Sequence, residues 1–247
     1  MAIESVVLRK AKSPVVAIIP VHERDAVHHS ARLMENLEEL NFDVVWHFNG
    51  MKKGTRLING LINWPNTLGY TIEPIISKRF VDHDRNGAVH IAMDSGAKWI
   101  TPHDADETLE SRAAWFLADI LKEPKHWVVQ WYNVWSIDSD GAPIIRIDPP
   151  YIGYKARFYP VDGHSYLYRA GTASLREASN KWPPRGDSGL RILHWGFCRP
   201  EHRQWHYERW NGTNGSNYWE GLVKDLDKVK LKRFDSDIPH EEFIRDS

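Results

Sequence analysis

The sequence has little cysteine, no long hydrophobic run and almost no net charge. Its 247 residues include one cysteine, Cys198, which excludes an internal disulfide and a metal site built from several thiolates. No hydrophobic run approaches the roughly 18 residues of a membrane-spanning helix, and the charged first residues are not typical of a secretion signal. We therefore expect a cytoplasmic protein without an integral membrane segment.

Charge and composition narrow the class of protein further. The 32 Lys and Arg residues nearly balance the 33 Asp and Glu residues, so the overall charge does not indicate a polyanionic partner. The chain also lacks repeats and low-complexity linkers, which would mark domain boundaries. Its 42% of hydrophobic residues can form one sizeable core. We expect a single domain over residues 1–247.

Hydrophobic patterning in the first half predicts alternating strands and helices. The apolar run Val15–Ile19 predicts a strand that is buried on both faces. Apolar residues at three- and four-residue spacing predict helices over 25–40, 86–96 and 109–120, and strands are expected at 42–48, 72–76 and 98–101. This order predicts an α/β fold with a mixed central sheet flanked by helices.

The second half has a less regular pattern. A strand is expected at 127–131, and the turn residues Asp138–Gly141 predict a hairpin over 136–147. Short strands are expected at 166–168 and 192–194, separated by a loop over 181–189 that is rich in Pro and Gly. Helices are expected at 200–210 and 218–226. Twelve tryptophans indicate either an aromatic core or a stacking surface for a ligand.

Three carboxylates, Asp104, Asp106 and Glu107, follow the apolar run that begins at Trp99. In an extended segment, side chains two residues apart point to the same side. Mg²⁺ and Mn²⁺ prefer oxygen ligands and are commonly held by one or two carboxylates together with ligand phosphates. The pattern therefore indicates a metal-assisted phosphate site. The alternative is that these acids cap a helix beginning near Thr108.

Five segments occur in an informative order, namely Val15–Arg24, Asn49–Gly50, Arg85–Asn86, Ala92–Ile100 and Asp104–Glu107. This order resembles the nucleotide-sugar glycosyltransferases of the GT-A fold, in particular the family-2 type, over roughly the first 120 residues. The resemblance implies a Rossmann-like mixed sheet. It also implies a nucleotide-sugar-binding half over 1–120 and an acceptor-binding half with C-terminal helices over 121–247.

The same resemblance assigns residues to the nucleotide-sugar donor. Residues after the first two strands would hold the nucleobase and ribose, and a later pair would lie near the nucleotide. In the order of these roles they are Pro20, Val21, His22 and Glu23, then Asn49, and then Arg85 and Asn86. Asp104 would contact the donor and, with Asp106, hold Mn²⁺ or Mg²⁺. The family usually has Asp at the position of Asn49, so the identity of the donor's nucleobase stays open.

The second half of the chain offers candidates for three further roles, of which the metal ligand and the base follow from the resemblance. His194, after the strand at 192–194, would supply another metal ligand, and Arg199, Arg203 and Arg209 could neutralise the leaving diphosphate. An inverting reaction needs a carboxylate that takes the proton from the acceptor hydroxyl. Asp187 lies in the segment from which related enzymes supply that base, and Asp162 is its competitor.

The sequence therefore predicts a metal-dependent glycosyltransferase with a nucleoside diphosphate sugar donor. Its acceptor hydroxyl could belong to a glycan, a lipid, a protein or a hydroxylated DNA base. One alternative is a nucleotidyltransferase, although residues 21–24 are charged where such enzymes have a Gly-rich phosphate loop. Another alternative is a carbohydrate- or nucleic-acid-binding module without catalysis, in which tryptophans stack on the ligand.

Overall fold

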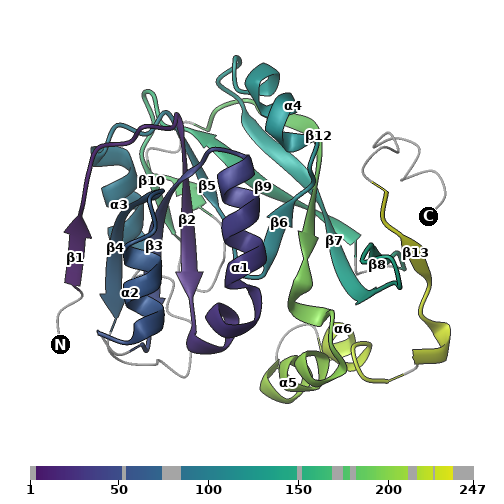
Figure 1. The fold of residues 1–247 in the computed structure, drawn as a ribbon. Helices are drawn as coiled ribbons and strands as arrows, with labels where there is room; N and C mark the ends of the chain where they lie inside the picture. The colour runs from purple at the N-terminus through teal and green to yellow at the C-terminus, as the bar shows by residue number, and fades with distance from the viewer. Residues whose placement is uncertain are drawn as a thin grey trace. The chain divides into compact units, whose positions relative to one another are not determined.

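The computed structural model describes residues 4–51, 54–73, 85–148, 152–168, 175–178, 182–210, 216–224 and 226–235, apart from the side chains of 23–28, 209–210 and 216–217 (Figure 1). Two compact units form. Unit 1 comprises residues 1–105, 114–128 and 156–188, and unit 2 comprises residues 106–113, 129–155 and 189–247. These units alternate along the chain and do not coincide with the halves 1–120 and 121–247. The expectation of a single domain stays a prediction.

Unit 1 contains a mostly parallel sheet, as the hydrophobic patterning predicts. Its strand order is β1 (Glu4–Val7), β4 (Thr67–Glu73), β3 (Asp43–Asn49), β2 (Val15–Val21), β5 (Trp99–Pro102) and β9 (Ile152–Pro160). Strands β4, β3, β2 and β5 are parallel, whereas β1 and β9 pair antiparallel with β4 and β5. The parallel strands are buried on both faces, which explains their continuous apolar runs.

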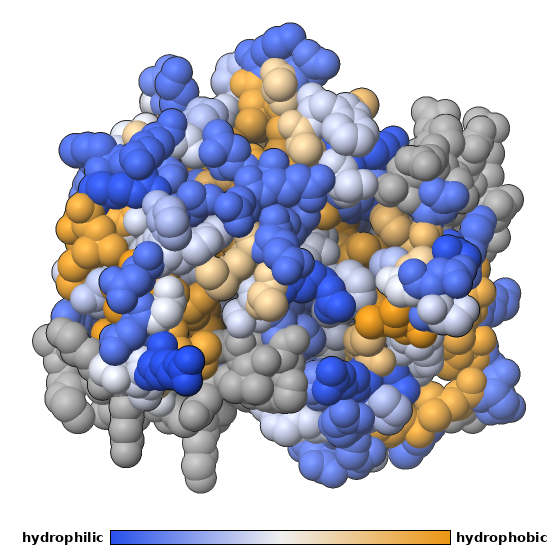
Figure 2. Space-filling model, viewed as in Figure 1, coloured by the Kyte–Doolittle hydropathy of each residue, from blue (hydrophilic) through white to orange (hydrophobic). Residues whose placement is uncertain are grey.

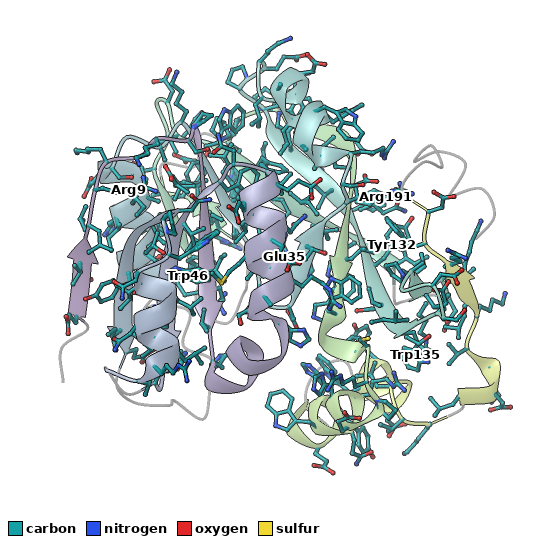
Figure 3. All side chains as sticks on the ribbon, in the orientation of Figure 1. Arg9, Glu35, Trp46, Tyr132, Trp135 and Arg191 are labelled. Carbon is teal, nitrogen blue, oxygen red and sulfur yellow. The ribbon has the colours of Figure 1, made fainter. Side chains whose placement is uncertain are left out.

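Helices cover both faces of this sheet, α1 (Glu23–Glu39) and α2 (Arg56–Ile62) on one side and α3 (Asn86–Asp94) on the other (Figure 1). Side chains alternate along β3, so Val45 packs with α3 in one core cluster. Trp46 faces the other way and lies beside α2, as its label in Figure 3 shows. The indole of Trp46 donates to Thr67 Oγ1 at 2.9 Å, and this hydroxyl donates to the carbonyl of Leu61 in α2 at 2.6 Å.

Two strands of unit 1 differ from the prediction. Strand β4 begins at Thr67, whereas the pattern indicated residues 72–76, because Gly69 interrupts the apolar run. A Cβ at Gly69 would lie 2.6 Å from the carbonyl oxygen of Val6, so glycine permits the close approach of β1. Strand β1 was not predicted. It is short and lies at the sheet edge, where Val7 is 55% exposed, and Figure 2 shows hydrophobic residues on the surface there.

The strands of unit 2 follow the order β13 (Leu231–Arg233), β8 (Pro143–Arg146), β7 (His126–Ile137), β12 (Arg185–His194) and β6 (Glu107–Leu109), and the first residues of β7 and β12 belong to unit 1. The pairs β13–β8, β8–β7 and β12–β6 are antiparallel. The hairpin of β7 and β8 confirms the predicted turn, since Asp138 accepts hydrogen bonds from the backbone N–H groups of Asp140 and Ala142. The helix expected from residue 109 begins later, because residues 107–109 pair with β12. The interpretation of the acids as a helix cap is therefore wrong.

The remaining elements are short. They are α4 (Ala113–Ile120), the paired strands β10 (Tyr166–Tyr168) and β11 (Leu175–Glu177), η2 (Trp195–Phe197), α5 (Pro200–Trp210), α6 (Ser216–Glu220) and η3 (Leu226–Lys228). Helix α5 confirms the prediction, and α6 is shorter than the expected 218–226. In the described part of the chain, no helix has the length and apolar character needed to cross a membrane.

Candidate functional site

The carboxyl ends of the parallel strands in unit 1 hold most of the residues assigned to the donor. Pro20 and Val21 end β2 and are buried, and His22 follows immediately before α1. Asn49 ends β3, and Asp104 comes two residues after the end of β5. Ligands of open α/β sheets bind outside the carboxyl ends of the strands. This edge of unit 1 is therefore a candidate nucleotide site.

His47 is buried in β3, and its pKa depends on charged groups near this edge of the sheet. Burial, together with the nearby Arg85 guanidinium and His22 ring, lowers the pKa of His47 to about 3. The ring is fixed by Thr71, whose hydroxyl lies 2.7 Å from His47 Nδ1. Arg85 and His22 therefore both act electrostatically on one buried imidazole, and their assignment to a ligand stays a prediction.

Acidification is expected to destabilise the protein through His47. The unfolded chain binds a proton at this residue below about pH 6.5, whereas the folded protein does so only near pH 3. Between these values the unfolded state binds more protons, so the free energy of unfolding should fall by at most about 1.4 kcal/mol per pH unit. Urea unfolding between pH 7 and 4.5 measures this slope. His47→Gln should reduce this slope, whereas His90→Gln, at an exposed position, is the control and should not. Equal slopes for the two variants would contradict the role of His47 in the loss of stability.

Tyr168 of β10 connects three of the predicted site residues. The Arg85 guanidinium lies 5.4 Å from the centre of its ring, and Asn86 Oδ1 accepts a hydrogen bond of 2.7 Å from its backbone N–H. Burial raises the pKa of Tyr168 to about 12, with Arg85 opposing the rise and the Asp104 carboxylate adding to it. Arg85, Asn86 and Asp104 thus surround one tyrosine in unit 1, where Asn86 anchors β10.

In unit 2, strands β6 and β12 bring Asp106 and His194 together. Glu107, the first residue of β6, lies opposite His194 in the antiparallel pair. The backbone N–H of Trp195 donates to the Asp106 carbonyl at 2.7 Å. Asp106 Oδ2 then lies 3.2 Å from His194 Nε2, and the two side chains are 10% and 11% exposed. Two of the three predicted metal ligands are therefore in direct contact.

Gly196 packs closely against this pair. A Cβ at Gly196 would lie 3.0 Å from Cε1 and 3.1 Å from Nε2 of His194, and it would overlap with Asp106 Oδ2. Any larger residue would therefore displace the Asp106 carboxylate or the His194 ring. A carboxylate oxygen and an imidazole nitrogen form a donor set that suits Mn²⁺. The residues present fit a small divalent cation at this position.

The complete metal set stays a prediction. Within the described ranges, no group of three or more His, Cys, Asp or Glu side chains is arranged to hold a metal ion. Asp104 belongs to unit 1, whereas Asp106 and His194 belong to unit 2. Mg²⁺ and Mn²⁺ sites in phosphate-binding enzymes commonly use one or two protein carboxylates, with the substrate phosphates completing the coordination.

Glu107 is a fully buried acid next to this pair. Its Oε1 accepts hydrogen bonds from Lys155 Nζ at 2.8 Å and from the Trp131 indole at 3.1 Å. The Lys155 ammonium also lies 4.2 Å from the centre of the Trp131 ring, and this ring is 5.1 Å from that of His194. Glu107 therefore fixes Lys155 and Trp131 along one side of the His194 ring.

The two candidate bases are both exposed residues of unit 1. Asp162 lies in the turn after β9, next to Gly163 with its positive φ of 71°. Asp187 lies within β12, in a segment predicted as a loop. Their assignment as base stays a prediction. The side chain of Glu23, which the resemblance assigns to the donor, lies outside the described residues.

The arginines of α5 differ in their surroundings. The Arg203 guanidinium donates to the carbonyls of Trp135 and Phe197 at 3.0 and 2.7 Å, and it lies 4.1 Å from the centre of the Trp135 ring. Arg203 therefore ties α5 to β7, which differs from its expected contact with a diphosphate. Arg199 is exposed, and the Arg209 side chain lies outside the described residues.

Sequence reasoning missed four residues around His194, namely Trp131, Asn133, Lys155 and Gly196. The first three lie in strands β7 and β9 and belong to no motif, so only the pairing of distant strands places them here. Gly196 gave a signal, because a glycine directly after the strand ending at His194 indicates a close approach. The sequence identified Glu107 only as one of the three carboxylates and did not predict that it is buried.

Comparison with known proteins gives a distant structural likeness. No family model and no curated protein matches the chain. The crystal structure of S. aureus TarS residues 1–349 in complex with UDP-GlcNAc matches with a TM-score of 0.41 and 11% identity, over 85% of this chain and 70% of that one. The same fragment in complex with UDP matches with a TM-score of 0.40 and 10% identity, over 85% and 69%. At these values the likeness assigns no activity or ligand to this chain.

Proposed function

We propose that this chain is a metal-dependent glycosyltransferase that moves a sugar from a nucleoside diphosphate sugar to an acceptor hydroxyl. The contact between Asp106 Oδ2 and His194 Nε2, against which Gly196 packs closely, is the observation that carries the proposal. It joins a carboxylate and an imidazole at the end of the motif that the sequence resemblance assigns to metal and diphosphate. Asp104, separated from Asp106 by Ala105 alone, is proposed as the further ligand.

Donor binding is proposed for the carboxyl edge of the sheet in unit 1. His22 follows β2 and Asn49 ends the neighbouring parallel strand β3, so both lie at the edge where we propose that the nucleobase and ribose bind. Pro20, Val21 and Glu23 complete this assignment, and Asn86 keeps β10 in place. Arg85 already contacts Tyr168 and supplies positive charge near Asp104. An anionic nucleotide is the ligand class that such a cation favours.

Catalysis requires charge stabilisation on the leaving group. When the sugar leaves, negative charge grows on the β-phosphate oxygen, and a bound divalent cation stabilises this charge more in the transition state than in the ground state. Asp106 and His194 hold their donor atoms in place through β6 and β12. In an inverting reaction, Asp187, or alternatively Asp162, would take the proton from the acceptor hydroxyl.

A screen of donors tests the proposal. Thermal unfolding is measured with a panel of nucleoside diphosphate sugars, each with Mn²⁺ or with EDTA, because a ligand that binds the native state raises its apparent stability. We expect one nucleotide to raise the unfolding temperature only with Mn²⁺, followed by release of the nucleoside diphosphate. Pyrophosphate release from a nucleoside triphosphate would instead establish nucleotidyl transfer. Binding that EDTA leaves unchanged, without consumption of donor, would establish a non-catalytic module.

A further inference from the structure

The His194 ring is held on three sides by residues of unit 2. Asn133 Oδ1 lies 2.9 Å from His194 Nδ1, and Asn133 is completely buried in β7. The ring of Trp131 lies 5.1 Å away, and Phe197 presents its edge at 4.8 Å. These contacts leave Nε2 as the ring nitrogen that faces Asp106.

Asn133 determines which ring nitrogen bears hydrogen. Its side-chain nitrogen donates to the Tyr218 hydroxyl of α6 at 3.4 Å, and its amide oxygen faces His194. An amide oxygen only accepts hydrogen bonds, so His194 Nδ1 must be the donor. In the neutral ring Nε2 then has a free electron pair directed at the Asp106 carboxylate. Two electron-rich atoms 3.2 Å apart are stabilised by a shared cation, which is either a proton on Nε2 in the imidazolium form or a bound metal ion.

We propose that Asn133 is a positioning residue that holds His194 in the Nδ1–H form, with Nε2 directed toward Asp106 as a cation ligand. The proposal rests on the proposed function, because it concerns the metal assigned to that site. Asn133 acts through His194, and Tyr218 in turn orients the Asn133 amide. Hydrogen-bond partners of this kind fix the ring and the tautomer of ligating histidines, and their loss typically weakens metal binding by about 10- to 100-fold.

Metal affinity provides the first test. Mn²⁺ binding is measured by electron paramagnetic resonance on the full chain, without donor or acceptor. Asn133→Leu removes the acceptor at similar size and should weaken Mn²⁺ binding at least about 10-fold, whereas Asn133→Asp keeps an oxygen at Nδ1 and should retain most of the affinity. Thr71→Val is the matched control, since it removes the Nδ1 partner of buried His47 in unit 1 and should leave Mn²⁺ affinity unchanged.

The ¹⁵N shifts of the His194 ring in the wild-type protein provide a second readout, which needs no metal. Wild-type protein above the titration range should show hydrogen on Nδ1 and none on Nε2, with the signals assigned by their loss in His194→Gln. Hydrogen on Nε2 of the neutral ring would overturn the role of Asn133 and leave the proposed function untouched. Mn²⁺ affinity of Asn133→Leu equal to that of wild type would do the same. Wild-type protein that shows the expected tautomer but binds no Mn²⁺, either alone or with any nucleoside diphosphate sugar of the panel, overturns the metal dependence of the proposed function and the ligand role together.

Discussion

Asp106→Asn is expected to lower the rate of sugar transfer at least about 100-fold while the protein stays folded. Asparagine keeps the shape of the side chain and removes the charge that faces His194 Nε2. A bound metal commonly contributes several kcal/mol of transition-state stabilisation, and losing about 3 kcal/mol corresponds to this change in rate. The measurement is turnover at saturating Mn²⁺ and donor, with circular dichroism and thermal unfolding to verify the fold.

Two further variants test whether this effect belongs to the site: one changes its packing, and the other makes the same change of charge elsewhere. Gly196→Ala keeps both donor atoms but places a methyl group against Asp106 Oδ2 and His194, so it should also reduce transfer and weaken Mn²⁺ binding. Asp119→Asn makes the same chemical change as Asp106→Asn at an exposed position of α4 and should leave transfer unchanged. Full turnover in Asp106→Asn would exclude the proposed role of the carboxylate.

Glu110→Gln is expected to produce the largest loss of stability, about 3–5 kcal/mol of unfolding free energy. Glu110 accepts three hydrogen bonds from Arg191, from the backbone N–H at 2.8 Å and from the guanidinium at 2.9 and 2.6 Å, and Arg112 adds two more. Neither the Glu110 nor the Arg191 side chain is exposed. Figure 3 shows Arg191 on β12, near Tyr132 of the neighbouring β7. Neutralising Glu110 leaves a buried guanidinium without its counter-charge.

Urea unfolding at neutral pH measures this loss, which is a large part of the 5–15 kcal/mol typical of a native protein. The double variant Glu110→Gln, Arg191→Met should recover much of the loss, because an apolar side chain no longer needs a counter-charge. Asp119→Asn breaks an exposed pair with Lys122 and should cost at most about 1 kcal/mol. Equal losses for the buried and the exposed pair would contradict the role given to burial.

The sequence predicts the parallel core of unit 1 well, because local patterns determine it. Strands buried on both faces read as apolar runs, and α1 shows its buried residues, such as Leu33 and Leu37, at helical spacing. The residues at the carboxyl ends of β2, β3 and β5 follow directly from the strand ends. The prediction is less accurate where pairing between distant segments determines the secondary structure. Leu109 fits a helical pattern, yet it lies in β6 because β12 offers it a partner at Ile192.

The residues of the candidate site likewise include some that local sequence patterns indicate and some that only strand pairing reveals. Asp106 and His194 were predicted from motifs, and their contact depends on the register of β6 against β12. Asn133 and Lys155 come from β7 and β9 and have no sequence signal, because ordinary strand residues become site residues only through the neighbours they meet. Arg203 belongs to a run of basic residues that indicates an anion contact, but its guanidinium packs on Trp135. A charge pattern does not reveal which cations are buried.

The pairing of β6 with β12 limits how this protein can vary. Successive side chains of a strand point to opposite faces, so a one-residue insertion or deletion within β12 would turn His194 away from Asp106. Point substitutions at neighbouring exposed positions leave that geometry intact. Diverged homologues that keep the activity should therefore preserve the length of β12 up to His194 while its exposed residues change, and should place their insertions in the connections between strands.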